Sequence, residues 1–407
     1  MEFSTELKNR GLVQDTSADI ERILGEKRTV YIGTDPTADS LHVGHLAWVV
    51  LLKRLGDAGH KLILLVGGGT GMIGDPKEKG ERSLKTIEEV DHNARAFEVQ
   101  LRSLLGEQVD FEMVNNALWL REVRLLDFLR DTGKHFTVND LVKRDLIRRR
   151  LETPDESISY TEFTYSLLQA YDYRELNERY GCDLQIGGSD QWTNILSGVD
   201  LIRKTTGKEV FAFSFPLITD ASGRKFGKSE GNALWLSGEK TSPYQFYQFW
   251  LNVEDEKVID YLKIYTFLSL EEIETIEKEH QVDPGARLAH RRLAEEMTSF
   301  THGDEATKSA IRISGILFDG LPLSDLSGAD KEMLVKNAPV FPGAKGQLLV
   351  EVLVGSGLAS SKREAREFIE SGAVTLAGEK LTNPETTMDF AELAILKRGK
   401  KNLVVLI

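Results

Sequence analysis

The sequence contains one cysteine, Cys182, in 407 residues. A single thiol cannot form a disulfide within the chain, and it cannot supply the several sulfur ligands of a Cys-rich zinc site. Long apolar runs are missing as well. No stretch approaches the roughly 20 apolar residues of a membrane helix, and residues 1–25 lack the apolar core of a secretory signal. We therefore expect a cytoplasmic protein without membrane contact and without a bound structural metal.

Positive charge is also scarce, because 51 Lys and Arg stand against 64 Asp and Glu and leave a formal net charge of −13. A protein that coats nucleic acid without specificity relies on broad neutralisation of phosphates, so the balance argues against that class. Local basic patches remain compatible with RNA binding. Residues 346–407 hold eight Lys and Arg against eight Asp and Glu, so the excess negative charge lies upstream of this segment.

The composition, 41% apolar and 28% charged, is that of folded globular domains. The length exceeds that of one core of usual size and predicts two or three domains. In the first half, short apolar runs alternate with longer helical patterns, which indicates an α/β domain with a mostly parallel sheet. The expected strands are residues 29–32, 61–66, 109–114, 183–186 and 210–218.

Turns that contain glycine follow the expected strands that end at Ile32, Val66 and Ile186. In parallel sheets of this kind, ligands bind beyond the carboxyl ends of the strands. The sequence therefore predicts a ligand-binding domain over residues 1–222 with its crevice at these turns.

The strand pattern disappears after about residue 242, and helical patterns such as 271–279 and 287–300 predict a helical domain over residues 241–322. Residues 323–345 are rich in Pro, Gly, Ser and Asp, and they are interpreted as a linker. Residues 346–407 predict a small α+β domain. There Ser361 and Glu364 have the spacing of a capping box, and residues 374–381 are typical of a hairpin around Gly378.

Two histidines, His42 and His45, lie three residues apart where Ser40 could cap a helix. Both rings can then face one site at the helix N-terminus, where backbone amides and the helix dipole favour an anion. The imidazoles could donate hydrogen bonds to a phosphate, and Gly44 leaves room for a flat base. Taken alone the motif is weak, because histidines at this spacing more often pack or face solvent.

Residues 223–231 form a glycine-rich segment, and we expect a mobile loop over residues 223–240. The segment contains Lys225, Lys228 and Ser229. The two lysines could neutralise a leaving pyrophosphate as the loop closes. In isolation, a solvated basic loop is the simpler interpretation.

Residues 69–74 match the dinucleotide fingerprint GxGxxG after an expected strand, so a dehydrogenase has to be considered. We interpret the match as coincidental. Asp91, at the distance expected for a ribose-binding acid, lies in a polar helical stretch and not at the end of a second strand. Asp75 places a carboxylate at the rim of the crevice, where it could bind an ammonium group.

Two further segments bring polar groups together. Tyr165, Gln169 and Asp172 recur at helical spacing, so their polar atoms can converge on one face and need partners if buried. An ordinary amphipathic surface helix is the alternative. In residues 185–191 a strand ends in two glycines, and Asp190 then offers an acceptor for ribose hydroxyls where the backbone approaches a ligand.

Basic side chains gather in two places that could touch RNA, although charge runs are usually solvated faces. The members are Lys143, Arg144, Arg148, Arg149 and Arg150 in the first cluster, and Lys362, Arg363 and Arg366 in the second.

Together these segments resemble the bacterial type of tyrosyl-tRNA synthetase, a class I aminoacyl-tRNA synthetase, over almost the whole chain. The matching parts occur in family order: residues 31–41, HVGH at 42–45, 67–76, 160–173, 185–192 and KFGKS at 225–229. The last domain resembles an S4 RNA-binding module. The resemblance implies a Rossmann-like catalytic domain, an α-helical domain on the anticodon side of the tRNA, an S4-like domain and a homodimer.

The implied activity is that of a tyrosine-tRNA ligase. L-tyrosine reacts with ATP, accompanied by Mg²⁺, to give tyrosyl-adenylate and pyrophosphate, and tyrosine then passes to the 3′-terminal adenosine of tRNA(Tyr). Neither step needs an enzyme nucleophile, so catalysis can rest on positioning and electrostatic stabilisation.

The resemblance also implies roles for individual residues. Those at the substrate tyrosine are Tyr31 and Asp172 for the phenol, Asp75, Tyr165 and Gln169 for the ammonium group, and Gln191 for the carboxylate. Those at ATP are Gly33, Asp35, Thr37, His42, Gly44, His45, Gly188, Asp190, Lys225, Lys228 and Ser229, of which His42, His45, Lys225 and Lys228 are catalytic through the phosphates. Those at tRNA are Lys143, Arg144, Arg148, Lys362, Arg363 and Arg366.

A buried Asp paired with the substrate hydroxyl would be left unsatisfied by phenylalanine, which is a known basis of discrimination in this family. The chain departs from many relatives at Ile32 and Thr34, where they have Cys and Phe. A polar contact from position 32 to the ribose is thereby lost.

Two rival interpretations remain. A tryptophanyl enzyme would share the histidine and lysine motifs but should lack the pairing of Tyr31 with Asp172 and the S4-like tail. An RNA-binding or splicing factor could retain a synthetase fold, since fold does not fix function. The complete set of adenylate-site polar residues speaks against the second.

Overall fold

The computed structural model describes residues 2–75, 86–154, 156–224, 226, 228–229, 232–319, 321–390, 392–399 and 402–407; for residues 145, 228, 229, 232 and 325 it describes the backbone alone. Two compact units result, Met1–Ser237 with Glu254–Gln281, and Gly238–Val253 with Val282–Ile407. We call them the N-terminal and the C-terminal unit.

The N-terminal unit alternates strands and helices. Its strands are β1 (Thr29–Thr34), β2 (Lys61–Val66), β3 (Phe111–Asn115), β4 (Leu184–Gly188), β5 (Phe211–Phe215), β6 (Lys228–Ser229) and β7 (Asn232–Ala233). Its helices and 3₁₀ turns are α1 (Phe3–Asn9), α2 (Ile20–Leu24), α3 (Val43–Asp57), η1 (Thr70–Met72), α4 (Ile87–Leu105), α5 (Ala117–Leu120), α6 (Leu125–Asp131), η2 (Gly133–His135), α7 (Val138–Leu141), α8 (Asp145–Glu152), α9 (Tyr160–Tyr180), η3 (Ser189–Gln191), α10 (Trp192–Thr206), α12 (Val258–Tyr265) and α13 (Leu270–Val282).

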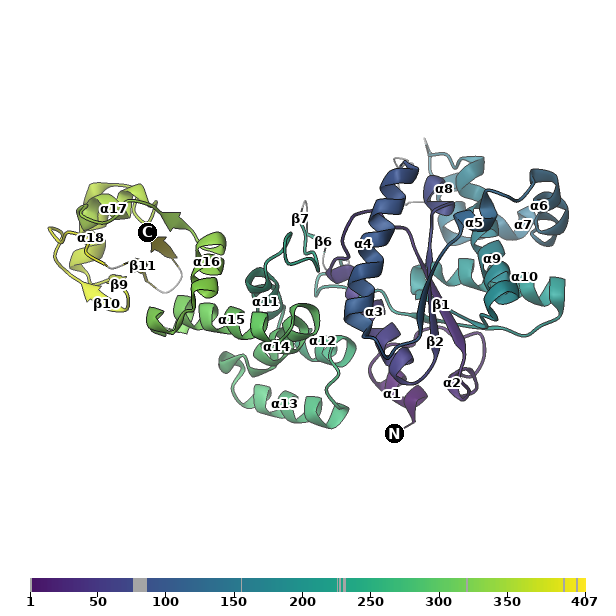
Figure 1. Cartoon of the computed structure of the whole chain (residues 1–407), viewed down its shortest axis with the longest axis horizontal. Helices are drawn as coiled ribbons and strands as arrows, with labels where there is room; N and C mark the ends of the chain where they lie inside the picture. The colour runs from purple at the N-terminus through teal and green to yellow at the C-terminus, as the bar shows by residue number, and fades with distance from the viewer. Residues whose placement is uncertain are drawn as a thin grey trace. The chain divides into compact units, whose positions relative to one another are not determined.

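Five parallel strands form the central sheet in the order β3-β2-β1-β4-β5. Helices α3 and α4 lie on one side of the sheet and α9 and α10 on the other (Figure 1). Because both faces are covered, the strands are almost continuously apolar, as in β2, where five of six residues are buried. The predicted Rossmann-like α/β class is confirmed. The strand order reverses between β1 and β4, which is where such sheets bind ligands.

The strand predictions hold to within a few residues. β5 ends at Phe215, three residues before the predicted end, because Pro216 cannot donate to the ladder.

Residues 70–72 form only the short turn η1 after β2, so the GxGxxG match does not open a helix there. A dinucleotide fingerprint needs such a helix N-terminus to hold its pyrophosphate.

Helix α9 carries three of the predicted site residues and is defined at both ends. Ser159 and Glu162 form a reciprocal capping box at its start, and Gly181 ends it in the left-handed region with φ +66°. Over 21 residues the helix is long enough to hold Tyr165 and Asp172 on one buried face.

Helix α12 belongs to the N-terminal unit, although the sequence predicted one helical domain over 241–322. Arg10 donates to Lys263 O at 3.1 Å and to Leu268 O at 2.6 Å, and Arg54 donates to Thr266 O. These buried guanidinium groups satisfy carbonyls at the helix end that would otherwise lack partners. No short-range pattern reveals such contacts, which span more than 200 residues.

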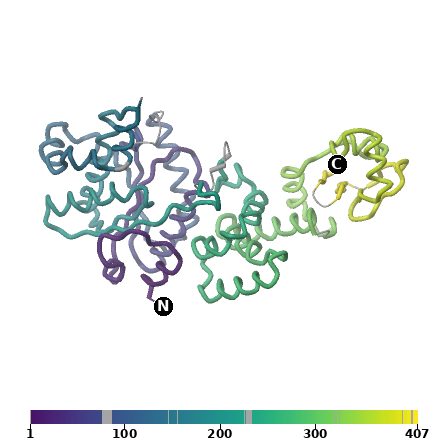
Figure 2. Tube along the Cα trace, turned by 180° about the vertical axis from the view of Figure 1, so that it is seen from behind, coloured from purple at the N-terminus to yellow at the C-terminus, as the bar shows by residue number. Residues whose placement is uncertain are grey.

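The C-terminal unit holds the remaining elements. They are α11 (Pro243–Leu251), η4 (Pro284–Ala286), α14 (Leu288–His302), α15 (Asp304–Ser314), the π-helical turn η5 (Gly315–Asp319), η6 (Leu323–Asp325), α16 (Gly328–Asn337), β8 (Val340–Phe341), α17 (Leu349–Gly355), α18 (Lys362–Glu370), β9 (Val374–Leu376), β10 (Glu379–Leu381), β11 (Ala394–Arg398) and β12 (Asn402–Leu406). The tube in Figure 2 traces this unit in green and yellow.

The end of the chain forms the predicted small α+β domain. Its sheet has the order β10-β9-β11-β12-β8 and packs with α17 and α18 around one apolar cluster. The hairpin of β9 and β10 turns at Ala377 (φ 49°) and Gly378 (φ 90°), as predicted. The capping box is half correct: Ser361 Oγ accepts from Glu364 N at 3.2 Å, but the Glu364 carboxylate accepts from Ser360.

The segment 323–345, predicted as a linker, contains helix α16 and strand β8. Ser327 and Asp330 form a reciprocal capping box, and Asp330 also accepts from Arg312 at 3.0 Å. Leu334 is fully buried, and β8 pairs with β12. Its Pro, Gly and Asp residues therefore mark turns and a helix start.

Among the described residues, no helix is long and apolar enough to cross a bilayer.

Candidate active site

A cavity of about 790 Å³ opens in the N-terminal unit at the carboxyl ends of β1 and β4. The structure gathers there every predicted tyrosine and ATP residue whose side chain it describes: Tyr31, Gly33, Asp35, Thr37, His42, Gly44, His45, Asp75, Tyr165, Gln169, Asp172, Gly188, Asp190 and Gln191. The reversal of strand order brings these residues, up to 160 positions apart, to one place.

Asp172 on α9 is buried and held by two donors. Its carboxylate accepts from Trp119 Nε1 at 2.7 Å and from Asn116 Nδ2 at 2.9 Å. Asn116 is fixed in turn, because Nδ2 also donates to Thr70 Oγ1 at 2.9 Å. Burial raises the pKa of Asp172 to about 7, while the two donors act to lower it. Both contacts stabilise the ionised carboxylate, which is left with lone pairs for a further donor.

Asn116 and Trp119 are not among the site residues predicted from the sequence. The available signal was their position directly after the expected strand 109–114, at the sheet edge where ligands bind. Their role is to hold Asp172 by hydrogen bonds, and Asp172 is separated from both by more than 50 positions in the sequence.

Three buried polar atoms around the cavity make no hydrogen bond to any described residue: Tyr31 Oη, Gln169 Oε1 and Gln185 Oε1. Tyr31 is only 1% exposed, and burial raises the pKa of its phenol well above the ordinary value. The phenol is therefore a neutral hydroxyl that can donate or accept. Buried polar atoms of this kind carry a large penalty unless a ligand supplies a partner.

Asp75 and Gln191 are bonded to each other at another part of the cavity wall. Gln191 Nε2 donates to Asp75 Oδ2 at 2.9 Å. Asn194 Nδ2 lies 3.4 Å from Asp75 Oδ1 and 3.3 Å from Gln191 Oε1. The group presents a carboxylate and an amide side by side, which suits a ligand that carries both an ammonium group and a carboxylate.

His42 and His45 stack face to face, with ring centroids 3.8 Å apart. His42, and not the predicted Ser40, caps α3: His42 Nδ1 accepts from Gly44 N at 3.1 Å and His45 Nδ1 from His42 N at 3.2 Å. Ser40 is buried instead, and its hydroxyl donates to Leu41 O at 2.8 Å. Since both Nδ1 atoms accept, the neutral rings carry their proton on Nε2 and can donate from there.

At two positions beside these groups, a neighbouring side chain occupies the space that the Cβ of any residue other than glycine would need. A Cβ at Gly44 would lie 2.8 Å from His42 Cε1, so Gly44 makes room for the capping ring. A Cβ at Gly67 would lie 2.1 Å from Asp35 Oδ1, so the turn after β2 can pass the Asp35 side chain only without one.

Phe226, inside the KFGKS motif, is buried against helix α12. Its ring centroid lies 4.5 Å from that of Tyr261 and 5.9 Å from that of Tyr265. Its amide donates to Ile218 O at 2.9 Å. Lys225 lies outside the described residues. Lys228 and Ser229 form β6, paired with β7, and their side chains are not described.

The first basic cluster is divided by its contacts. Lys143 and Arg148 are exposed, whereas Arg150 is buried in an ion pair with Glu162 at 2.6 Å. Arg144 is half-buried and donates to Asn194 and Ser197. In the second cluster Lys362, Arg363 and Arg366 are all exposed on α18.

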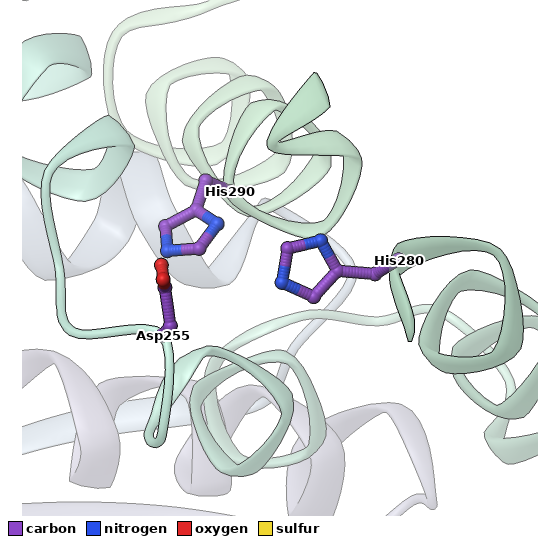
Figure 3. A group of neighbouring side chains, drawn as sticks. All are labelled: Asp255, His280 and His290. Atoms are coloured by element: carbon purple, nitrogen blue, oxygen red, sulfur yellow. The ribbon is translucent and has the colours of Figure 1, made fainter. Parts of the chain in front are cut away.

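Figure 3 draws three potential metal ligands, Asp255, His280 and His290. Asp255 and His280 belong to the N-terminal unit and His290 to the C-terminal unit. Each unit contributes fewer ligands from this set than the three or four of a typical protein site, so we assign no metal to them.

Comparisons with known proteins agree with this geometry. Residues 25–319 match the family described as tRNA synthetases class I (W and Y), and residues 330–406 match the Tyrosine–tRNA ligase SYY-like C-terminal domain. The chain belongs to the class I tRNA synthetases. The predicted resemblance is thereby confirmed, and the dehydrogenase interpretation of residues 69–74 is wrong.

Relatives favour tyrosine over tryptophan within this synthetase family. The chain is 49% identical to Tyrosine–tRNA ligase 1 of Vibrio parahaemolyticus over 98% of this chain and 96% of that protein. It is 46% identical to Tyrosine–tRNA ligase of Geobacillus stearothermophilus over 98% of both. A C-terminally truncated mitochondrial tyrosyl-tRNA synthetase of Aspergillus nidulans has a similar structure, with a TM-score of 0.69 at 31% identity over 78% of this chain and 94% of that one.

Proposed function

We propose that the cavity binds L-tyrosine and ATP, joins them as tyrosyl-adenylate with release of pyrophosphate, and passes tyrosine to the 3′-terminal adenosine of tRNA(Tyr). The observation that carries the tyrosine assignment is the buried pair of Tyr31 and Asp172. An uncommitted hydroxyl and a carboxylate with raised pKa, both almost fully buried, line the cavity. A phenol hydroxyl can donate to one and accept from the other.

The other end of the amino acid meets Asp75, Tyr165 and Gln169 with its ammonium group and Gln191 with its carboxylate side. Asp75 and Gln191 support this role, because they present opposite hydrogen-bonding character within 2.9 Å of each other. Held there, the substrate carboxylate attacks the α-phosphorus of ATP and pyrophosphate leaves, so no enzyme nucleophile is needed.

ATP occupies the side of the cavity that His42 and His45 line. Their Nε2 protons and the N-terminus of α3 favour the negative charge that builds on the phosphates. Asp190 accepts from the ribose, and Gly33, Asp35, Thr37, Gly44 and Gly188 contact the nucleotide through loops at the strand ends. Lys225, Lys228 and Ser229 act on the pyrophosphate, and Mg²⁺ accompanies ATP as part of the substrate.

The tRNA contacts proposed for the C-terminal domain are Lys362, Arg363 and Arg366. Their exposure on one helix supports this role, because phosphate contacts need accessible cations. Lys143 and Arg148 are proposed contacts of the N-terminal unit.

A cytoplasmic location follows from the substrates, since ATP and tRNA meet there.

We propose that the enzyme is a homodimer in which the second copy covers helix α6. None of the residues of α6, all of them described, is buried, although the helix carries three leucines and a phenylalanine. Seven of the exposed large apolar side chains lie between positions 118 and 160: Leu118, Leu125, Leu126, Leu129, Val138, Leu151 and Tyr160. Exposed apolar surface on this scale is typical of a protein interface.

A charging assay tests the proposed function. The protein is incubated with ATP, Mg²⁺, unfractionated tRNA and labelled tyrosine, and the label should appear in an alkali-labile ester with tRNA. Binding of tRNA without charging by any amino acid would favour the RNA-binding alternative instead.

A further inference from the structure

Arg144 connects helix α10 to the segment that begins α8. Its Nη2 donates to Ser197 Oγ at 2.7 Å and its Nη1 to Asn194 Oδ1 at 3.1 Å. Ser197 Oγ itself donates to Thr193 O at 2.9 Å, so its lone pairs face the guanidinium group. Burial lowers the pKa of Arg144 below its ordinary value, but an arginine remains charged.

A guanidinium group can only donate, and this property fixes the direction of every hydrogen bond that follows. The Asn194 atom that faces Arg144 must be the oxygen. Its Nδ2 therefore faces Asp75 Oδ1 at 3.4 Å and Gln191 Oε1 at 3.3 Å. Gln191 then has its Nε2 free to donate to Asp75 Oδ2 at 2.9 Å.

Without Arg144 the Asn194 oxygen loses its described donor, and only the long contacts of Nδ2 to Asp75 and Gln191 hold the amide in this orientation. A flipped amide would turn its oxygen toward Asp75, and two acceptors would then repel each other. The hydrogen bonds of Asp75 and Gln191 would rearrange, and the substrate would meet a different pattern of donors and acceptors.

We propose that Arg144 is a positioning residue for the amino-acid site, which acts through Asn194 to orient Gln191 and Asp75, and that it is not a tRNA contact. The inference rests on the proposed binding of tyrosine at Asp75 and Gln191. Asp75 and Gln191 line the cavity, whereas Arg144 and Asn194 do not. Arg144 and Asn194 therefore act on the substrate only through Asp75 and Gln191.

Tyrosine-dependent exchange between ATP and pyrophosphate tests this proposal in the full-length enzyme. Arg144→Met keeps the stem but removes all donors, and it should raise KM for tyrosine about tenfold while KM for ATP changes by less than about twofold. Asn194→Asp keeps the acceptor for Arg144 but loses the donor to Asp75, so KM for tyrosine should rise by a similar factor. Arg144→Lys, which retains one cation, should lie between wild type and Arg144→Met.

The double variant Arg144→Met with Asn194→Asp should be little worse than either single variant, because both break the same chain of contacts. Arg102→Met is the matched control. Arg102 lies on α4 in an exposed ion pair with Glu98 at 2.7 Å, and its loss should leave both KM values unchanged.

Three results would overturn the inference. One is an unchanged KM for tyrosine in Arg144→Met together with a raised KM for tRNA in charging. The second is no change in either. The third is an equal rise in KM for tyrosine and ATP with a lowered unfolding temperature, which would mean general damage. Failure of the proposed function looks different: the wild type would show no exchange with tyrosine, or Asp75→Asn would leave KM for tyrosine unchanged.

Discussion

Asp172 is the residue at which burial and hydrogen bonding oppose each other most directly. Burial raises its pKa to about 7, and the donors Trp119 and Asn116 hold it from rising further. In the proposed complex the ionised form accepts the substrate hydroxyl, and this form is lost as pH falls through the pKa. We expect KM for tyrosine to rise about tenfold for each unit of pH below about 7, while KM for ATP stays level. A flat profile of KM for tyrosine between pH 6 and 8.5 would contradict this.

Trp119→Phe removes one donor from the same carboxylate and keeps most of the ring. A hydrogen bond to a charged group contributes about 1.5–3 kcal/mol, so its loss should raise the pKa of Asp172 by about one unit or more. The pH below which KM for tyrosine begins to rise should increase by that amount. If this pH stays where the wild type has it, the contact of 2.7 Å does not tune Asp172.

His45 caps α3, and we propose that its Nε2 also donates to the phosphates of ATP; substitutions can separate the two. His45→Ala loses both, whereas His45→Gln restores an acceptor for the capping box. We expect kcat for exchange to fall about 100-fold or more in both variants, with tRNA binding retained. Recovery of the rate in His45→Gln, whose amide can both accept and donate, would show that the imidazole itself is not required.

At this scale the sequence predicted residues that line the cavity, but not the side chains that hold them in place. The residues that line the cavity carry recognisable spacing, such as the three-residue step of His42 and His45. Asn116, Trp119 and Asn194 form no such pattern, because their partners are distant in sequence and meet them only in the folded sheet.

At the scale of elements, α18 carries three exposed cations. Replacing Lys362, Arg363 and Arg366 together with Gln should raise KM for tRNA and flatten its dependence on salt, by a slope of about two to three for three lost phosphate contacts. Exchange with tyrosine should not change, since that step needs no tRNA. An unchanged salt slope would mean that α18 does not contact tRNA.

Elements were predicted well where one local signal decides them. The hairpin at Ala377 and Gly378 and the apolar strand β2 are set by turn chemistry and by burial on both faces. The cap of α3 was predicted wrongly, because histidine is an unusual N-cap. The linker prediction missed α16, whose capping box at Ser327 and Asp330 carries the same spacing that was recognised at Ser361.

At the scale of the whole molecule, the apolar helix α6 predicts a second copy. Leu126 is 78% exposed, so Leu126→Glu should leave the fold intact but place a charge in the interface and weaken the dimer at least about 100-fold. Val99→Glu, a change at a 70% exposed valine on α4, is the control. Sedimentation velocity should give monomers for Leu126→Glu alone. A dimer that survives this change, or a monomeric wild type, contradicts the assignment.

The division into two units could not be read from the sequence, although the fold class of each part could. Periodicity identifies helices, but it does not say that α12 joins the sheet-containing unit while α11 and α14 belong to the other. That assignment depends on contacts such as those of Arg10 and Arg54, which carry no local pattern.

Selection of tyrosine by this site can be measured by ATP–pyrophosphate exchange with tyrosine, phenylalanine and tryptophan. Phenylalanine cannot donate to Asp172, which then keeps only Trp119 and Asn116 as donors, and it offers Tyr31 Oη no partner. The loss of both contacts in a buried site predicts a kcat/KM at least about 100-fold below that of tyrosine. Tryptophan should support no more exchange than phenylalanine. If phenylalanine or tryptophan supports exchange as fast as tyrosine or faster, the site does not select tyrosine.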